Sequence, residues 1–297
     1  MAGPGEQQPQ QRYITLTELY EVVRIEFASY FASIDFKRRT CVNTMWKKLG
    51  LFWRAETTTD DDASSTQCEI YEPISRHTHT VIFLHGRDST AEDFAMELFE
   101  STGSQEQTLG EALPSVKWVF PTAPMIESAR FGMSMSQWFD MCATEDPHEG
   151  EAEQNPTQAI DIVYTHLSRE AAIIGWSNVV LAGISQGAAV GIHALLKQPH
   201  KLGGFIGLNA WLPNPESIAN ASKRWPEAVQ TAVMLAHTRD DPVINIKFGE
   251  ELRRRLEKLG MQVEWHDYMT APNENPHWVN EPQGVDDIID FIKKVTA

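Results

Sequence analysis

From residue 68 onward the chain alternates short apolar runs with amphipathic segments, and no other feature of the sequence restricts the fold as strongly. The apolar runs are rich in β-branched and aromatic residues and lack a polar face, which is typical of strands buried on both sides. Such strands separated by helices predict a mostly parallel sheet with helices on both faces. The expected strands are 79–85, 116–120, 178–184, 203–213, 231–237 and 262–268, and the expected helices are 91–101, 156–175, the segment from 186 onward, 245–260 and 284–297.

The N-terminal part differs in composition from the rest. Residues 1–56 carry a net charge of +2, against −18 for the remainder of the chain. Residues 57–67 are polar and rich in turn formers, which indicates a linker, and apolar residues at helical spacing within 16–27 predict an amphipathic helix. Residues 41–54 place Trp, Leu and Phe beside Lys and Arg, which fits either a helical arm packed on its own domain or an element that transiently contacts a membrane surface. The expected organisation is a helical extension with a linker over 1–67 and one domain over 68–297.

The net charge and the cysteine content limit which partners the protein can bind and in which cellular compartment it is expected. The net charge of −16 would repel nucleic acids and anionic lipids. Residues 1–11 lack the features of a signal peptide, and no run approaches the roughly 18 apolar residues of a membrane span. Cys41, Cys68 and Cys142 fit neither a disulfide framework nor a zinc pattern. We therefore expect a cytoplasmic protein without a nucleic-acid partner.

The acidic loop 145–153 is interpreted as solvated, so no metal is assigned to it.

The segment Gly183-Ile184-Ser185-Gln186-Gly187 lies where a predicted strand passes into a predicted helix. A nucleophile elbow has this form, because a strained turn lifts the serine hydroxyl above the sheet and the glycines leave room for neighbouring backbone. A serine that only caps the helix is the alternative. The position between strand and helix favours Ser185 as a nucleophile.

A serine nucleophile needs a general base and a carboxylate that orients the base. Asp240 and Asp241 both follow the predicted strand 231–237, and either could serve. His277 lies in a loop before the last predicted helix, which is a suitable place for the base. The order Ser, Asp, His along the chain is the order found in α/β-hydrolases.

Acyl transfer also needs donors for the oxyanion of the tetrahedral intermediate, and often an apolar pocket for the acyl chain. The backbone N–H groups of Gln186 and Arg87 are the expected donors, with His85 supporting the loop that carries Arg87. A set of Met and aromatic residues in expected loops could line an acyl pocket or belong to the core, and both interpretations stay open. These residues are Met133, Met135, Trp138, Phe139 and Trp211.

Several motifs taken together resemble the acyl-protein thioesterase, carboxylesterase and lysophospholipase family, over about residue 79 to the C-terminus. They are VIFLHG, VFPTAP, SQWFDM, GISQGAA, NAWLP, the Asp-Pro pair in DDPVI, and the histidine of the final loop. The resemblance implies an α/β-hydrolase fold, no cofactor, Asp241 as the triad carboxylate, and Trp138 within the segment that borders the substrate groove. The family commonly has HGxGD where this chain has HGRDS, a form similar to that of a fungal subgroup.

The resemblance implies a serine hydrolase that removes fatty acyl groups from protein cysteines or from lysophospholipids. The expected partners are therefore an acylated protein, a lysolipid or a small ester. A carboxylesterase for small molecules, for instance in secondary metabolism, is the alternative within enzymology. A non-catalytic binding protein that keeps the hydrolase fold is the alternative of another class.

Overall fold

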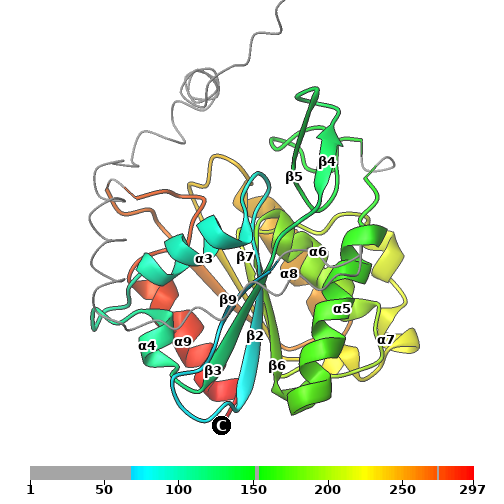
Figure 1. The fold of residues 1–297 in the computed structure, drawn as a ribbon. Helices are drawn as coiled ribbons and strands as arrows, with labels where there is room; N and C mark the ends of the chain where they lie inside the picture. The colour runs from blue at the N-terminus through cyan, green and yellow to red at the C-terminus, as the bar shows by residue number, and fades with distance from the viewer. Residues whose placement is uncertain (1–67, 151–153, 273) are drawn as a thin grey trace, which may run out of the picture. The chain divides into compact units, whose positions relative to one another are not determined.

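A seven-stranded sheet forms the centre of the molecule in the computed structural model, which describes residues 68–150, 154–272 and 274–297 (Figure 1). The strand order is β1-β3-β2-β6-β7-β8-β9. All neighbouring pairs are parallel except β1 with β3, so the predicted mostly parallel sheet is confirmed. The strands are β1 (Cys68–Tyr71), β2 (His79–Leu84), β3 (Val116–Pro121), β6 (Val179–Ile184), β7 (Gly204–Leu208), β8 (Val233–Thr238) and β9 (Val263–Tyr268).

Helices cover both faces of the sheet, as Figure 1 shows. One hydrophobic cluster holds α5 (Thr157–Ile174), α6 (Gln186–Leu196) and α8 (Ile246–Lys258) on one face. A second cluster holds α3 (Ala91–Glu100), α4 (Leu109–Ala112) and α9 (Gln283–Val295) on the other. The remaining short elements are α7 (Ala221–Arg224) and the 3₁₀ turns η1 (Trp176–Asn178), η2 (Pro215–Ile218) and η3 (Ala228–Gln230).

Strand β6 shows why these runs have no polar face. Successive side chains of a strand point to opposite faces. Val179 and Leu181 accordingly belong to the first cluster, whereas Val180, Ala182 and Ile184 belong to the second. A strand with helices on both sides must therefore be apolar at every position.

Three strands were not expected from the sequence. The edge strand β1 pairs antiparallel with β3, and a hairpin of β4 (Met125–Ser128) and β5 (Met133–Ser136) forms a separate two-stranded sheet. Met133 and Met135 therefore lie on a strand, which corrects the expectation that they lie in a loop. The predicted strand 203–213 is also shorter, because β7 ends at Leu208. The predicted helix within 16–27, segment 41–54 and linker 57–67 fall outside the described residues.

Strand β9 forms the other edge of the sheet and differs from the central strands. Its side chains are mostly half-buried, and three of them, Glu264, His266 and Asp267, are ionisable. Glu264 pairs with Lys294 at 2.7 Å, and Asp267 pairs with Arg239 at 2.7 Å.

Candidate active site

Ser185 lies in the sharp turn between β6 and α6, as the sequence predicts. Its backbone has φ 54° and ψ −124°, in a region that residues with a side chain rarely occupy. Its backbone N–H donates to the carbonyl of Leu208 at 2.8 Å, and its own carbonyl accepts from the N–H of Ala189 at 3.0 Å. The residue is only 8% exposed. The turn therefore fixes the serine backbone at the carboxyl end of the sheet.

The two glycines around Ser185 are required by close backbone contacts. A Cβ at Gly183 would lie 2.5 Å from the backbone nitrogen of Ala188, and a Cβ at Gly187 would lie 2.5 Å from the carbonyl oxygens of Leu84 and His85. Real Cβ atoms do not approach backbone so closely. The helix can thus begin directly behind Ser185 only because both positions lack a side chain.

Asp241 and His277 form a buried hydrogen-bonded pair. Asp241 lies three residues after the end of β8, and its Oδ1 accepts from the backbone N–H groups of Val243 at 2.7 Å and Ile244 at 3.1 Å. Its Oδ2 accepts from Nδ1 of His277 at 2.7 Å, and the two residues are 7% and 5% exposed. Because a carboxylate only accepts, Nδ1 carries the proton, and Nε2 is the ring nitrogen that can take up another.

A second histidine, His237, lies beside the same carboxylate. Its Nε2 is 3.7 Å from Oδ2 of Asp241 and donates to the carbonyl of Ile244 at 2.8 Å. Burial lowers the pKa of His237 below its usual value, so this ring stays neutral next to Asp241. Asp240, the other carboxylate considered, is exposed and accepts from Thr270 instead.

The loop after β2 lies next to the nucleophile turn. A Cβ built on Gly86 would be 3.6 Å from Cβ of Ser185. His85 is fully buried, its Nδ1 donates to the carbonyl of Gly86 at 2.6 Å, and its Nε2 accepts from the N–H of Ala123 at 2.9 Å. Burial lowers the pKa of His85 to about 4. A neutral imidazole with both nitrogens bonded therefore holds the loop in place, as expected of His85.

Arg87 and Asp88 connect this loop to the β4–β5 hairpin. The guanidinium of Arg87 lies over the ring of Phe131, 5.3 Å from its centroid. The N–H of Asp88, a residue with φ 63°, donates to the carbonyl of Ser136 at 2.7 Å. The backbone of Arg87 is thus fixed from both sides.

Gln186 contributes a side-chain clamp in addition to its backbone. It is fully buried, its Oε1 accepts from the N–H of Trp138 at 2.8 Å, and its Nε2 donates to the carbonyl of Phe139 at 2.7 Å. The indole N–H of Trp138 in turn donates to the carbonyl of His85 at 2.8 Å. Segment 138–139 is therefore tied to both loops that would supply oxyanion donors.

The candidate pocket residues have very different surroundings. Trp138, Phe139 and Trp211 are each about 1% exposed and belong to the first hydrophobic cluster, where Phe139 and Trp211 pack edge to face. Met133 is 42% exposed on β5, and Met135 is buried at 7%. A direct contact of any of them with substrate stays a prediction.

The residues described by the structure hold no group of three or more His, Cys, Asp or Glu side chains arranged for a metal ion. In the acidic loop, the His148 ring packs on Phe248, and its Nε2 lies 4.0 Å from a Glu251 carboxylate oxygen. Among the helices that the structure describes, none is long and apolar enough to cross a membrane.

Two features of the site were missed in the sequence. The motif NAWLP was noted only for its tryptophan, yet its first residue, Asn209, lies at a strand end with its side chain buried. The side chain of Gln186 was likewise not considered. A polar residue within two positions of the end of a buried parallel strand was a usable signal in both cases, since ligand sites form at such ends.

Comparisons with known proteins identify the family and the fold. A family model described as phospholipase/carboxylesterase matches residues 65–296. An acyl-protein thioesterase 1 of Gibberella zeae is 31% identical over 231 residues, which cover 76% of this chain and 94% of that protein.

A probable inactive carboxylesterase of Oryza sativa subsp. japonica is 32% identical over 193 residues, covering 63% of this chain and 75% of that protein. Among solved structures, the crystal structure of Zea mays acyl-protein thioesterase 2 has a TM-score of 0.63 at 22% identity, covering 78% of this chain and all of that one. This last similarity concerns the fold.

Proposed function

Because the chain belongs to the phospholipase/carboxylesterase family, we propose that it is a serine hydrolase that cleaves acyl thioesters and related esters. Ser185 is the nucleophile, His277 the general base and acid, and Asp241 the carboxylate that orients the imidazole. The backbone N–H groups of Arg87 and Gln186 hold the oxyanion. The observation that carries the proposal is the buried 2.7 Å bond between Asp241 and His277, together with a strained serine turn at the end of β6, two strands away from β8 in the same sheet.

The first half-reaction transfers the acyl group to the enzyme. Ser185 Oγ attacks the carbonyl carbon while Nε2 of His277 takes the hydroxyl proton. The negative charge that develops on the carbonyl oxygen is held by the two N–H groups. When the tetrahedral intermediate collapses, the bond to the leaving sulfur or oxygen breaks, and His277 returns the proton to the leaving group.

The second half-reaction releases the acid. A water molecule attacks the acyl-serine ester, with His277 again accepting the proton, and the intermediate expels Ser185 as a neutral hydroxyl. Asp241 keeps its proton-free form throughout and stabilises the transient imidazolium. The serine is thereby regenerated.

The names of the relatives support an acylated protein as the substrate, and a cytoplasmic location is part of the same proposal. Several fungal proteins about 30% identical to this chain are named acyl-protein thioesterases. Lysophospholipids, suggested by the family description, would present the same acyl carbonyl. Met125 and Met133, which are 67% and 42% exposed on the β4–β5 hairpin, provide apolar surface close to the Arg87 loop for an acyl chain.

Residues 68–297 are proposed to be the catalytic domain, and residues 1–67 an extension of it. The match of the family model, which begins at residue 65, supports this division. Transient contact of residues 41–54 with a membrane surface is part of the same proposal, since Trp, Leu and Phe stand beside Lys and Arg there.

Two alternatives are carried by specific observations. The family description includes carboxylesterases, and the proposed oxyanion loop carries a charged side chain, the Arg87 guanidinium that lies over Phe131, so a small-molecule carboxylesterase is one alternative. A non-catalytic protein with this fold is the other alternative, because one relative is named a probable inactive carboxylesterase.

Covalent labelling tests catalysis directly. A fluorophosphonate phosphonylates an activated serine with loss of fluoride, so the wild type should label and Ser185→Ala should not. Ser177→Ala is the matched control, because Ser177 is exposed and lies just before β6, whereas Ser185 lies just after it. Failure of the folded wild type to label would favour the non-catalytic alternative.

Substrate class is tested by comparing kcat/KM for a palmitoyl thioester with that for short-chain p-nitrophenyl esters. A thioesterase should prefer the long thioester. A preference for the short esters would support the small-molecule carboxylesterase instead. Measuring the same ratio in Arg87→Gly shows whether the guanidinium contributes to the preference.

A further inference from the structure

Asn209 lies where the three segments that carry Ser185, Asp241 and His277 meet. It directly follows β7 and is 2% exposed. Its backbone N–H donates to the carbonyl of Ala236 in β8 at 2.9 Å, and the preceding carbonyl, that of Leu208, accepts from the N–H of Ser185 at 2.8 Å. The nucleophile turn is therefore bonded to the residue next to Asn209.

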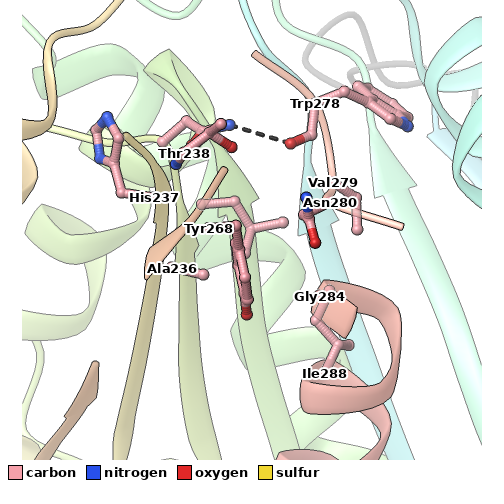
Figure 2. A pocket seen from close by; sticks show the side chains of 11 residues that line it. Ala236, His237, Thr238, Tyr268, Trp278, Val279, Asn280, Gly284 and Ile288 are labelled. Atoms are coloured by element: carbon pink, nitrogen blue, oxygen red, sulfur yellow. Dashed lines mark hydrogen bonds between the residues drawn. The ribbon is translucent and has the colours of Figure 1, made fainter. Parts of the chain in front are cut away.

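The side chain of Asn209 joins the other two segments. Its Oδ1 accepts from the N–H of Thr238 at 3.0 Å, and the carbonyl of Thr238 accepts from the N–H of Asp241 at 3.2 Å. Its Nδ2 donates to the carbonyl of Trp278 at 3.1 Å, drawn as the dashed line in Figure 2. Trp278 follows His277 in the chain, so one amide bridges the Asp241 turn and the His277 loop.

The contacts on either side of the Trp278 carbonyl show where this loop is attached to the rest of the domain. Figure 2 shows a pocket beneath it, bounded by Tyr268, Asn280 and the start of α9. The indole of Trp278 is anchored to one side, where its N–H donates to Oγ of Ser101 at 3.2 Å and its ring packs edge to face on Phe94. The bond from Asn209 instead ties the backbone beside His277 to the strand ends.

We propose that Asn209 is a positioning residue that holds the His277 loop and the Asp241 turn in register with the nucleophile turn. The inference rests on the function proposed above. An amide suits this role because it presents a donor and an acceptor at equal reach, whereas a carboxylate presents acceptors only. Asparagine also tolerates the backbone φ of 46° found here better than other residues with a side chain.

Asn209→Gly removes the amide and keeps a residue that accepts a positive φ. We expect kcat for ester hydrolysis to fall about 100-fold, because misplacement by about 1 Å has effects of that size, while KM changes little. Asn214→Gly is the matched control. Asn214 also has φ 46°, and its Nδ2 donates to the carbonyl of Gln154 at 3.2 Å. That variant should keep the wild-type kcat.

Asn209→Asp separates positioning from packing. In this variant the ionised carboxylate still accepts from the Thr238 N–H, but its second oxygen faces the Trp278 carbonyl, and two acceptors cannot form a hydrogen bond. When the carboxyl group is protonated, its O–H can donate to the Trp278 carbonyl. The kcat of this variant relative to wild type should therefore rise as the pH is lowered from about 8 to about 5. The titratable groups around the site are His237, Asp241, Tyr268 and His277, and they are present in both proteins.

The outcomes are distinguishable. Wild-type kcat in Asn209→Gly, or a kcat ratio for Asn209→Asp that does not vary with pH, would overturn the role of Asn209 while fluorophosphonate labelling of the wild type still supports the hydrolase. A wild type that does not label overturns the proposed function and, with it, this inference.

Discussion

The backbone of Ser185 has a conformation that is unfavourable for a residue with a side chain. A residue other than glycine at φ 54° costs about 1–3 kcal/mol and persists only where the surroundings impose it. Here β6, the bond to Leu208 and the first turn of α6 impose it. The strain places the hydroxyl outside the regular geometry of both elements, where a substrate can reach it.

Gly187→Ala should prevent formation of the elbow. The added methyl group would meet the carbonyl oxygens of Leu84 and His85, which cannot move without disturbing β2. We expect a loss of about 1–3 kcal/mol in the free energy of unfolding and loss of fluorophosphonate labelling.

Gly191→Ala is the control for that change, one turn further along α6. There the added atom would meet side chains and no backbone, those of Phe205 at 3.1 Å and Leu84 at 3.6 Å, and alanine favours the helix by about 1 kcal/mol. Labelling should survive. Equal damage from both substitutions, measured by urea unfolding and by labelling, would contradict the backbone-contact argument.

Asp241→Asn should remove activity while keeping the turn. The amide oxygen can still accept from Val243 and Ile244, but the NH₂ group then faces His277 and forces the ring proton onto Nε2. That nitrogen can no longer take the serine proton, so kcat should fall about 10⁴-fold. Asp240→Asn, at an exposed carboxylate, is the control. An Asp241→Asn variant within a few-fold of wild type would exclude this role for Asp241.

At the scale of elements, helix α6 has a buried glutamine at or near each end. Gln186 clamps the distant segment 138–139 beside the site, whereas Gln198, just beyond the other end of α6, accepts from the N–H of His200 at 2.7 Å within its own turn. Both side chains are at most 2% exposed. Both glutamines thus bond to backbone groups, but only Gln186 connects α6 to another segment.

The two glutamines provide a prediction with its own control. Gln186→Leu and Gln198→Leu each leave buried backbone groups unpaired, so each should lower the free energy of unfolding by about 1–3 kcal/mol. Only Gln186→Leu should also lower kcat, because segment 138–139 supports the His85 loop. Measurement of kcat and urea unfolding for both variants decides this, and equal kcat values would show that the clamp is purely structural.

The order of elements could be predicted from the sequence because strands buried on both faces have an unmistakable apolar pattern. All six predicted strands are present, and Ser185, Asp241 and His277 follow strand ends as expected. The hairpin β4–β5 was missed because its residues alternate between exposed and buried only weakly over four positions. The burial of Trp138, Phe139 and Trp211 was left open because an aromatic residue in a long loop can equally contact substrate or pack beneath the loop.

At the scale of the whole molecule, four buried histidines make stability depend on pH. Burial lowers the pKa of His237, and it lowers the pKa of His85, His166 and His193 to about 4. In the unfolded chain each titrates near 6.5, so between these values the unfolded state binds more protons than the folded one. The free energy of unfolding therefore has its full value above about pH 6.5. It falls as the pH is lowered, by up to about 1.4 kcal/mol per pH unit for each histidine.

Urea unfolding between about pH 6.5 and pH 5, above the range in which most carboxylates titrate, measures this dependence. His193→Gln should make it shallower, because one of these contributions is removed while the site of Ser185 is left alone. A free energy of unfolding that does not change over this range would mean that the native protein already takes up these protons.

The charged edge strand β9 has a consequence for the protein at high concentration. A strand at the border of a sheet exposes unpaired backbone groups onto which a foreign chain can add as a further strand. Glu264 and Asp267, with their partners Lys294 and Arg239, line this border with charged side chains that an added strand would have to remove from water. The molecule thus carries, at the side of the sheet opposite β1, a built-in barrier against aggregation into fibrils.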